Sequence, residues 1–247
     1  MDVVIIAEKN GDALMIPQKS KLPKRYQPKG FKILHEDKAI IVGIKAAGFL
    51  TVAAKWNKDQ TVHSALNEYV RKGNYKSQKR VYVVHRLDQG TSGVLIFAKT
   101  EEAQICLKDN WKNTKKIYYA VVHGRLAKKS GLIESYLVED EDYMMHATSD
   151  KERGKFAQTA YSVIKEKGDL TLVEINLLTG RKNQIRVHFS DEGHPVVGDD
   201  KYTEGTSRSK RLALHSKSIS FAHPVTGEPL TFEAPVPEYF RSLVGKW

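Results

Sequence analysis

The sequence predicts an α+β fold built on a large, mostly antiparallel (mixed) central sheet with flanking helices and loops. Short apolar runs typical of strands outnumber segments with helical spacing, and the two kinds do not alternate as a doubly wound parallel sheet requires. At 247 residues the chain is long enough to bury a substantial core in one or two domains. Its 40% apolar and 28% charged residues are those of an ordinary globular protein.

The N-terminal half gives the clearest individual elements. Over Phe31–Val52, short apolar runs are separated by turn residues, which predicts strands. A helix is expected next, between the capping residue Thr61 and Gly73, because apolar residues recur there at every fourth position. The runs "VYVV" and "VLIFA" predict strands on either side of "HRLDQGTSG", His85–Gly93. A second helix is expected over about Thr100–Trp111, with acidic residues in its first turn.

Strand patterns dominate the second half. The run "KKIYYAVVHGRL" predicts one strand, and "GDLTLVEINLLTGRKNQIRVHF" predicts two strands around a turn at Thr179–Gly180. The tail segments "SISFAHP" and "EPLTFEAP" add further strand patterns. Before these elements, Pro17–Gly30 combines prolines, glycine and basic residues, which is typical of an arm along a phosphate backbone or of a solvated leader.

The charge balance favours a polyanionic partner. The chain has 40 Lys and Arg against 29 Asp and Glu, a net charge of +11. Nucleic acid is the first partner that such an excess indicates and an anionic membrane the second, although many basic proteins only carry a positive solvated surface. No window approaches a membrane span, and the first apolar run is too short for a signal peptide. We therefore expect a soluble, cytoplasmic protein without a membrane partner.

Metal and cofactor sites find little support in the sequence. Cys106 is the only cysteine, which excludes an intrachain disulfide and indicates a reducing compartment. The nine histidines are scattered, and no HExxH or CxxC spacing occurs. No glycine-rich pattern matches a dinucleotide site or a P-loop. The expectation is an activity without metal or organic cofactor.

Asp88, in "HRLDQGTSG", is the best single candidate for chemistry. An aspartate two positions from an arginine, here Arg86, is commonly a surface ion pair. Here the loop lies between two apolar strands, which make a rigid mount, and Gly90 and Gly93 permit unusual backbone geometry. Thr91 supplies a hydroxyl and a neighbouring amide. A carboxylate supported in this way and close to a guanidinium is suited to act as a nucleophile or base.

A second group of polar residues lies in "TGRKNQIRVHFSDEGHPVVGD". In the predicted strand, Gln184, Arg186 and His188 share one face, and the apolar residues between them share the other. A solvated face is the alternative interpretation. Arg181 and Arg186 lie close to a glycine turn and suit the recognition of phosphate or carboxylate.

Two further features point towards RNA. Tyr118 and Tyr119 lie on opposite faces of their strand, so that one can face a cleft and stack on a base, although packing alone would also explain either ring. The segment "RKGNYKSQKR", residues 71–80, is a candidate RNA-contacting rim, with a solvated loop as the alternative. It carries no acidic residue and five basic ones: Arg71, Lys72, Lys76, Lys79 and Arg80.

A second catalytic carboxylate, which a glycosidase would need, is not evident. The acidic cluster Glu139–Asp142 is more typical of a solvated loop.

Taken together, these motifs resemble the RluA-like family of RNA pseudouridine synthases. The resemblance rests on "HRLDQGTSGVLIFAKT", "KKIYYAVVHG", "LLTGRKNQIRVHFSDEGHPVVGDDKY" and "LALHSKSISFAHPVTGEPLTFEAPVP", and it runs from about Ile33 to the C-terminus. Two departures concern the KPAG segment of the family, here "KAAG" at Lys45–Gly48, and the usual THQIR, here "KNQIR". Neither departure changes the aspartate.

The resemblance implies isomerisation of uridine to pseudouridine in RNA, on the pseudouridine synthase fold and without a cofactor. Asp88 is implied as the catalytic aspartate, attacking the sugar or the base or removing a ribose proton. Tyr118 is implied to stack on uracil, and Arg186 to pair with the aspartate. Arg86 is implied to displace the target base. The remaining expected RNA contacts are His85, Thr91 and Arg181.

The sequence thus predicts a catalytic domain over residues 33–247, preceded by a basic arm over residues 1–32. We expect a monomeric enzyme that acts on a structured ribosomal or transfer RNA. An RNA-binding protein that has lost the modification activity is one alternative, and a nucleoside-cleaving enzyme is another. The intact set Asp88, Tyr118 and Arg186 argues against the first, and the basic surface argues against the second.

Overall fold

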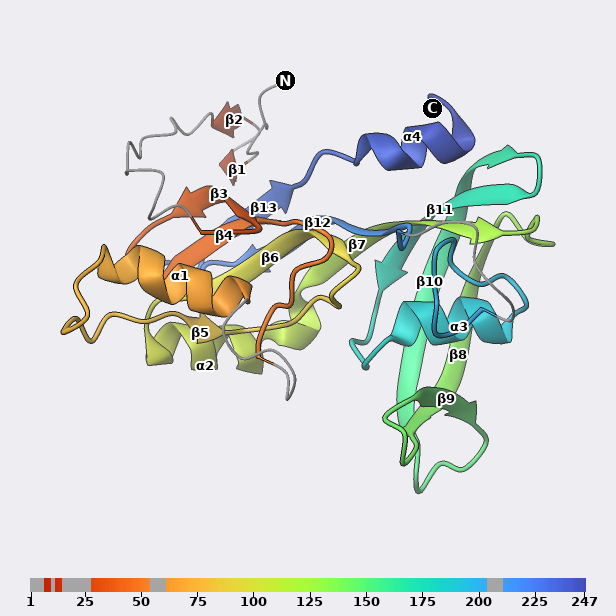
Figure 1. Cartoon of the computed structure of the whole chain (residues 1–247), viewed down its shortest axis with the longest axis horizontal. Helices are drawn as coiled ribbons and strands as arrows, with labels where there is room; N and C mark the ends of the chain where they lie inside the picture. Colours follow the sequence, from red (N-terminus) through yellow and green to blue (C-terminus); the bar gives the residue numbers. More distant parts are fainter. Residues whose placement is uncertain (1–6, 10–11, 15–27, 54–60, 204–210) are drawn as a thin grey trace. The chain divides into compact units, whose positions relative to one another are not determined.

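The computed structural model describes residues 7–9, 12–14, 28–53, 61–203 and 211–247 (Figure 1). The chain divides into two compact units. The first unit comprises Met1–Thr114 and Ser216–Pro235, and the second comprises Lys115–His215 and Val236–Trp247. Much of the predicted basic arm, residues 1–32, lies outside the described residues.

The predicted α+β class is confirmed. Eleven strands of the described residues belong to one sheet, and a separate pair forms a second, small sheet. The pairs whose residue register is resolved are antiparallel. This arrangement is the large, mostly antiparallel sheet that the irregular order of strands and helices predicts.

In the first unit, the strand order is β3-β4-β6-β12, with β5 paired to β6 and β13 paired to β12. The bounds are β3 Phe31–Glu36, β4 Ile40–Lys45, β5 Tyr82–Val83, β6 Ser92–Ala98, β12 Leu214–Ala222 and β13 Pro229–Glu233. The small sheet pairs β1, Ala7–Lys9, with β2, Asp12–Leu14. The strands predicted around "HRLDQGTSG" are therefore present as β5 and β6.

The two predicted helices of this unit are also confirmed. Helix α1, Val62–Arg71, begins after Thr61, whose hydroxyl accepts a hydrogen bond from the Ser64 amide at 3.0 Å. Helix α2, Glu101–Asp109, is capped in the same way by Thr100, and a 3₁₀ turn follows at Trp111–Asn113. The core of this unit includes Val42, Ile96, Leu107 and Phe232, contributed by β4, β6, α2 and β13.

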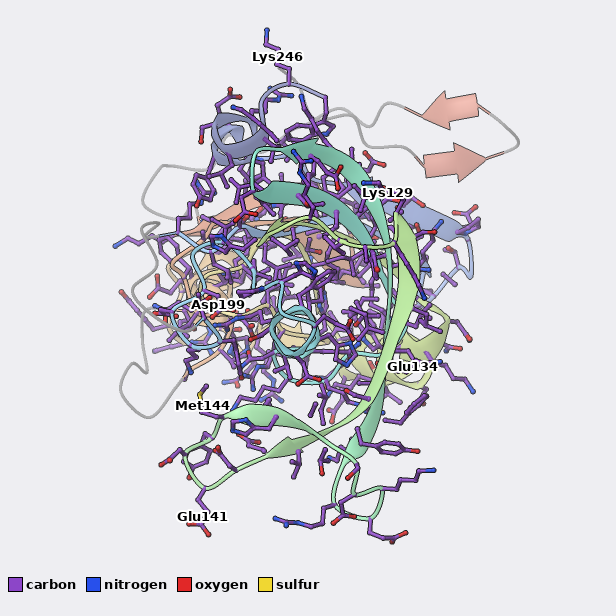
Figure 2. The ribbon with its side chains drawn as sticks, turned by 90° about the vertical axis from the view of Figure 1, so that its right-hand side faces the viewer. Lys129, Glu134, Glu141, Met144, Asp199 and Lys246 are labelled. Carbon is purple, nitrogen blue, oxygen red and sulfur yellow. The ribbon has the colours of Figure 1, made fainter. Side chains whose placement is uncertain are left out.

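The second unit is built on a strand order of β7-β11-β10-β8-β9 (Figure 1). The bounds are β7 Lys115–His123, β8 Ser130–Glu139, β9 Met145–Thr148, β10 Lys155–Lys167 and β11 Leu170–Leu177. Helix α3, Gln184–Asp191, contacts β8, β9 and β10, and helix α4, Glu238–Val244, contacts β7, β10 and β11. The turn after β8 carries Glu141 and Met144, both labelled in Figure 2.

The strand predicted after the Thr179–Gly180 turn is wrong, because Gln184–Asp191 forms helix α3. Every side chain from 184 to 189 is buried, so the helix has polar and apolar neighbours on all sides. Gln184, for example, donates to the Gln158 carbonyl and the Thr159 hydroxyl at 2.9 Å. When both faces of a segment are buried, alternating polarity does not distinguish a strand from a helix. Asn183, with φ of 52°, turns the chain into the helix.

Gly93 has a conformation that its place in the motif demands. Its φ is +119°, and a Cβ built there would lie 2.1 Å from the Ser216 carbonyl oxygen of β12. Gly90, for which the motif predicts the same freedom, is not among the positive-φ glycines. The close approach of β6 to β12 therefore depends on Gly93 and not on Gly90.

We predict that Gly93→Ala destabilises the protein by about 3 kcal/mol or more, because the added carbon meets backbone and the φ is strained. Urea unfolding at neutral pH measures this as a lower midpoint. Gly180→Ala is the matched control, since a Cβ added at that position would have no atom within 4 Å. An equal effect of the two substitutions would contradict the role given to Gly93.

Candidate active site

Asp88 lies in the first unit, on the loop between β5 and β6. Its side chain is half-buried, and its carbonyl accepts a hydrogen bond from the Thr91 amide at 3.1 Å. The preceding Leu87 is buried, whereas Gln89 is exposed. Asp88 therefore lies at the point where the loop passes from the buried core to the protein surface.

The segment after β4 holds the backbone on both sides of Asp88. The Thr51 hydroxyl donates to the Leu87 carbonyl at 2.8 Å and accepts from the Leu87 amide at 3.1 Å. The Gly48 amide donates to the Gln89 carbonyl at 2.8 Å, and the Gln89 side chain donates back to the Gly48 carbonyl at 3.1 Å. Both peptide neighbours of Asp88 are thus tied to residues 48–51.

The buried side chain of Lys45 also holds the backbone of the Asp88 loop in place. Its side chain is fully buried at the end of β4. Its Nζ donates to the carbonyls of Ala46 at 3.0 Å, Phe49 at 2.7 Å and Gln89 at 3.1 Å. Three acceptors match the three N–H groups of an ammonium. One buried cation therefore joins the end of β4, the following turn and the Asp88 loop.

The charge of Lys45 is set by two opposing effects. Burial lowers the pKa of its ammonium from 10.5 to about 7, and the negative charge of Asp88 acts in the opposite direction. The Asp88 carboxylate thus faces a nearby positive charge within its own unit. Replacing Lys45 with an apolar group would be costly, because the three buried carbonyls that it now satisfies would lose their donor.

His85 and Thr91 are held within the loop. The His85 Nε2 accepts a hydrogen bond from the Ile96 amide at 3.1 Å, so this nitrogen carries no proton. Its ring lies 4.6 Å from that of Trp111. Thr91 is only 2% exposed, while Arg86 is exposed. Of these three predicted RNA contacts, Arg86 is exposed, His85 is half-buried and Thr91 is buried.

The predicted residues Tyr118, Arg186 and Arg181 belong to the second unit. Tyr118 lies in β7 opposite Ile175 of β11 and is 7% exposed, whereas its neighbour Tyr119 is half-buried. The expected alternation of the two tyrosines is therefore confirmed. Arg181 is exposed, and its Nε donates to the Phe156 carbonyl at 2.9 Å.

Arg186 makes a buried two-point ion pair with Asp199. Its Nε and Nη2 donate to the two carboxylate oxygens at 2.7 and 2.6 Å, and its guanidinium lies 5.1 Å from the centre of the Tyr202 ring. Asp199, labelled in Figure 2, also accepts from the amides of Lys201 and Tyr202. This carboxylate fixes Arg186 within its unit, while the pairing of Arg186 with Asp88 stays a prediction.

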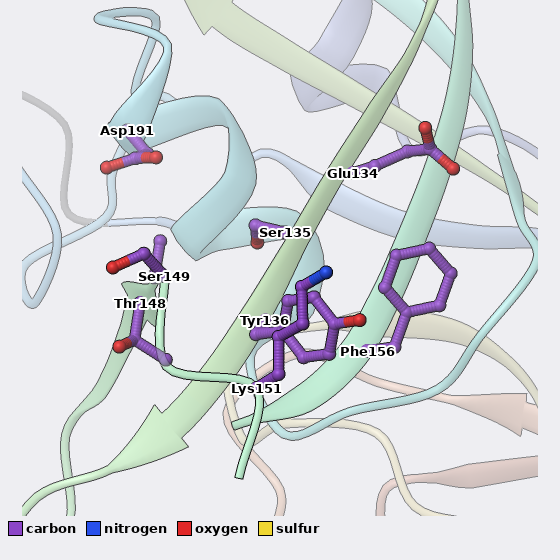
Figure 3. A pocket seen from close by; sticks show the side chains of 9 residues that line it. Glu134, Ser135, Tyr136, Thr148, Ser149, Lys151, Phe156 and Asp191 are labelled. Atoms are coloured by element: carbon purple, nitrogen blue, oxygen red, sulfur yellow. The ribbon is translucent and has the colours of Figure 1, made fainter. Parts of the chain in front are cut away.

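A shallow hollow of about 550 Å³ lies in the second unit (Figure 3). Tyr136, Phe156 and Lys151 line it together with Ser135 and Asp191. None of the residues predicted from the sequence lines this hollow. It is therefore not assigned to the reaction.

Three comparisons identify the protein family. A family model described as RNA pseudouridylate synthase matches residues 39–191. The chain is 36% identical to the dual-specificity RNA pseudouridine synthase RluA of Yersinia pestis, covering 81% of this chain and 97% of the relative. It is 34% identical to the ribosomal large subunit pseudouridine synthase D of Xanthomonas campestris, covering 86% and 68%.

The chain belongs to the RluA-like family of RNA pseudouridine synthases. It is accordingly an isomerase that acts on uridine in RNA. The fold agrees, because human RNA pseudouridylate synthase domain containing 4 superposes with a TM-score of 0.71 over 87% of this chain and 92% of that one, at 22% identity.

The structure gives roles to three residues that the sequence did not single out: Lys45, Thr51 and Asp199. The sequence alone marks "KAAG" as a departure from the family pattern but assigns no role to Lys45, and neither Thr51 nor Asp199 stands out in it. The sequence around Lys45 does not indicate its burial, because lysine is rarely fully buried. The partners of Thr51 and Asp199 lie 36 and 13 residues away in the chain, so only the fold identifies them.

Over the described part of the chain, no helix is both long and apolar enough to cross a membrane. Within the same residues, no three His, Cys, Asp or Glu side chains gather as a metal site would require.

We predict that Lys45→Met reduces the pH dependence of folding stability. The pKa of Lys45 is about 7 in the folded chain and 10.5 ordinarily, so the unfolded chain binds more protons between these values. The stability of the unaltered enzyme should therefore rise as the pH increases from 7 towards 10.5, and the variant should show a smaller rise, because Lys116, whose pKa is also lowered by burial, still contributes. Urea unfolding at several pH values in this window measures the slope.

Lys38→Met, at an exposed lysine in the turn between β3 and β4, is the control and should keep the slope of the unaltered enzyme. A Lys45→Met variant with that same slope would show that Lys45 is not the titrating group.

Proposed function

We propose that Asp88 is the catalytic carboxylate and that the substrate is a uridine in a structured ribosomal or transfer RNA. The supporting observation is the attachment of the Asp88 loop by Thr51, Gly48 and Lys45, which restrains the backbone on both sides of the aspartate. A group that must meet one atom of a displaced nucleotide needs such a restrained mount. A surface ion pair would not need it.

The chemistry of the isomerisation suits a single carboxylate. The N-glycosidic bond of uridine breaks, the uracil turns, and its C5 forms a new bond to the same sugar carbon. Every atom of the nucleotide is kept, so no water has to be activated by a second carboxylate. One carboxylate acting as nucleophile or base, together with a group that handles the C5 proton, is sufficient.

Tyr118 and Arg186 are assigned to the same reaction through their motifs. We assign Tyr118 to stacking on uracil and to proton transfer at C5, since a tyrosine offers both an apolar ring and a hydroxyl. Arg186 is assigned as the positive partner of Asp88. Its attachment to Asp199 supports a fixed position, because a two-point ion pair holds the guanidinium plane in one orientation.

The exposed basic residues are assigned to the RNA. A base in a folded RNA must leave its stack, at a cost of a few kcal/mol, and the exposed Arg86 next to the catalytic loop is suited to take its place. Arg181 and the basic segment 71–80 are exposed or half-exposed and suit the phosphates. His85 and Thr91 would contribute by shaping the loop that meets the RNA.

The catalytic domain in this proposal is residues 33–247, which includes parts of both units, and residues 1–32 are a basic arm along the RNA. The enzyme acts as a monomer in the cytoplasm. A single cysteine and a formal charge of +11 are consistent with a reducing compartment and a polyanionic substrate.

We predict that Asp88→Ala abolishes pseudouridine formation but leaves RNA affinity within about twofold, since the carboxylate is needed for the chemical step and not for phosphate contacts. The assay is pseudouridine mapping in RNA taken from cells that lack the gene and then treated with each protein. Asp109→Ala, at the exposed end of α2, should retain full activity. Substantial modification by Asp88→Ala would exclude Asp88 as the catalytic group.

We predict that neutralising the five basic residues of segment 71–80 weakens RNA binding and reduces its salt dependence. For each phosphate that is no longer neutralised, the slope of log affinity against log salt should fall by about 0.7–0.9. Binding titrations at several salt concentrations measure both quantities. Neutralising the exposed Lys128 and Lys129 is the comparison. An unchanged slope for the segment 71–80 variant would mean that this segment is only a solvated loop.

A further inference from the structure

The segment between α1 and β5 contains an aromatic side chain in an unusual setting. Tyr75 is 95% exposed, so both faces of its ring are in solvent. It lies among the five basic residues of segment 71–80, and the segment contains no acidic residue. A solvent-exposed ring in a segment whose charged residues are all cations has the composition of a surface that binds single-stranded nucleic acid, where bases stack on aromatic rings and cations follow the backbone.

The turn that carries Tyr75 is structured by its own hydrogen bonds. The Asn74 amide donates to the Arg71 carbonyl, and the Ser77 amide donates to the Asn74 carbonyl, both at 3.0 Å. The Asn74 side chain accepts from the Lys76 amide at 3.0 Å. Across the loop, the Arg71 Nε donates to the Lys79 carbonyl at 3.2 Å. The backbone on both sides of Tyr75 is therefore held in a defined turn.

The base of this loop is tied to α1. The Val81 amide donates to the Asn67 side chain at 2.8 Å, and the His63 ring bonds to the Val81 carbonyl at 3.0 Å. A rigid aromatic side chain on a fixed turn loses little conformational entropy when it binds. The backbone that carries Tyr75 is thus ordered before RNA binds.

Other tyrosine rings near basic residues are already engaged. Arg80 lies over the ring of Tyr82, 5.2 Å from its centre, and donates to its hydroxyl at 3.1 Å. Tyr143, 63% exposed, has the Lys182 Nζ 5.9 Å from its ring centre and follows the acidic residues 139–142. Exposure alone therefore does not distinguish Tyr75, whereas exposure within a wholly basic segment does.

We propose that Tyr75 is a stacking platform for an unpaired base of the RNA substrate, and that the basic residues around it hold the phosphates on either side of that base. This inference rests on the proposed function for the RNA partner and names the part of the RNA that segment 71–80 recognises. The ligand is an unstacked nucleobase in a loop, bulge or single-stranded flank, because the bases of a continuous duplex do not offer a free face.

The test separates stacking from charge. The full-length protein is titrated with a short oligoadenylate and with an abasic oligomer of equal length and charge, both carrying a fluorescent label. Adenine is chosen because it stacks well and is not isomerised. Tyr75→Ala should weaken oligoadenylate binding roughly tenfold, since stacking on one base contributes about that much. Binding of the abasic oligomer should not change.

Matched variants complete the test. Tyr75→Phe keeps the ring and should bind both oligomers as the unaltered protein does. Lys76→Ala should weaken both oligomers equally and make the salt dependence shallower. Tyr143→Ala removes an exposed ring from acidic surroundings and should change neither affinity.

The inference is overturned if Tyr75→Ala leaves oligoadenylate affinity unchanged, if it weakens both oligomers equally, or if the unaltered protein does not prefer oligoadenylate to the abasic oligomer. Failure of the proposed function is a separate result, because it would be an absence of pseudouridine in RNA treated with the unaltered protein.

Discussion

The Lys45 side chain and the backbone carbonyls around it form the constraint on which the Asp88 loop depends. A buried amino group without acceptors is unfavourable, so the carbonyls of Ala46, Phe49 and Gln89 stay close to Nζ in the folded protein. This requirement ties residues far apart in the sequence, at the end of β4 and beside Asp88. The Thr51 hydroxyl adds a second connection through Leu87. The loop is thereby positioned by polar contacts, although its flanking strands are apolar.

The second unit uses a comparable device around Arg186. The guanidinium is buried with Asp199, and removing one member of such a pair costs about 3–5 kcal/mol because the other charge stays buried. Two adjacent backbone amides also donate to Asp199, so the carboxylate is satisfied without water. Each unit of this pseudouridine synthase thus fixes one charged residue of the predicted catalytic set by burying an ionic partner next to it.

The basic residues fall into two groups, buried ones that hold other groups in place and exposed ones that are proposed to bind RNA. The ionic groups Lys45 and Arg186 are buried, and each holds the position of other groups within its own unit. The basic residues of segment 71–80 are exposed or half-exposed, where a cation loses little hydration until it meets a phosphate. Tyr75 adds an aromatic ring to that surface. In the proposed function, binding and catalysis therefore rely on different groups, which allows each to be altered separately.

The fold class, most strands and both helices of the first unit follow from the sequence alone, because periodicity and helix caps are local properties. The motif around Asp88 also stands out locally, whereas Tyr118 and the pairing role of Arg186 are candidates through the resemblance to a family. The prediction of a strand was wrong at α3. Residues 184–189 are all buried there, so the alternation of polar and apolar residues does not mark an exposed face. Only the tertiary structure revealed the roles of Lys45, Thr51 and Asp199, since their partners are set by chain packing. The hydrogen-bond partners of a buried polar residue come from distant parts of the chain, so a local sequence pattern does not identify them.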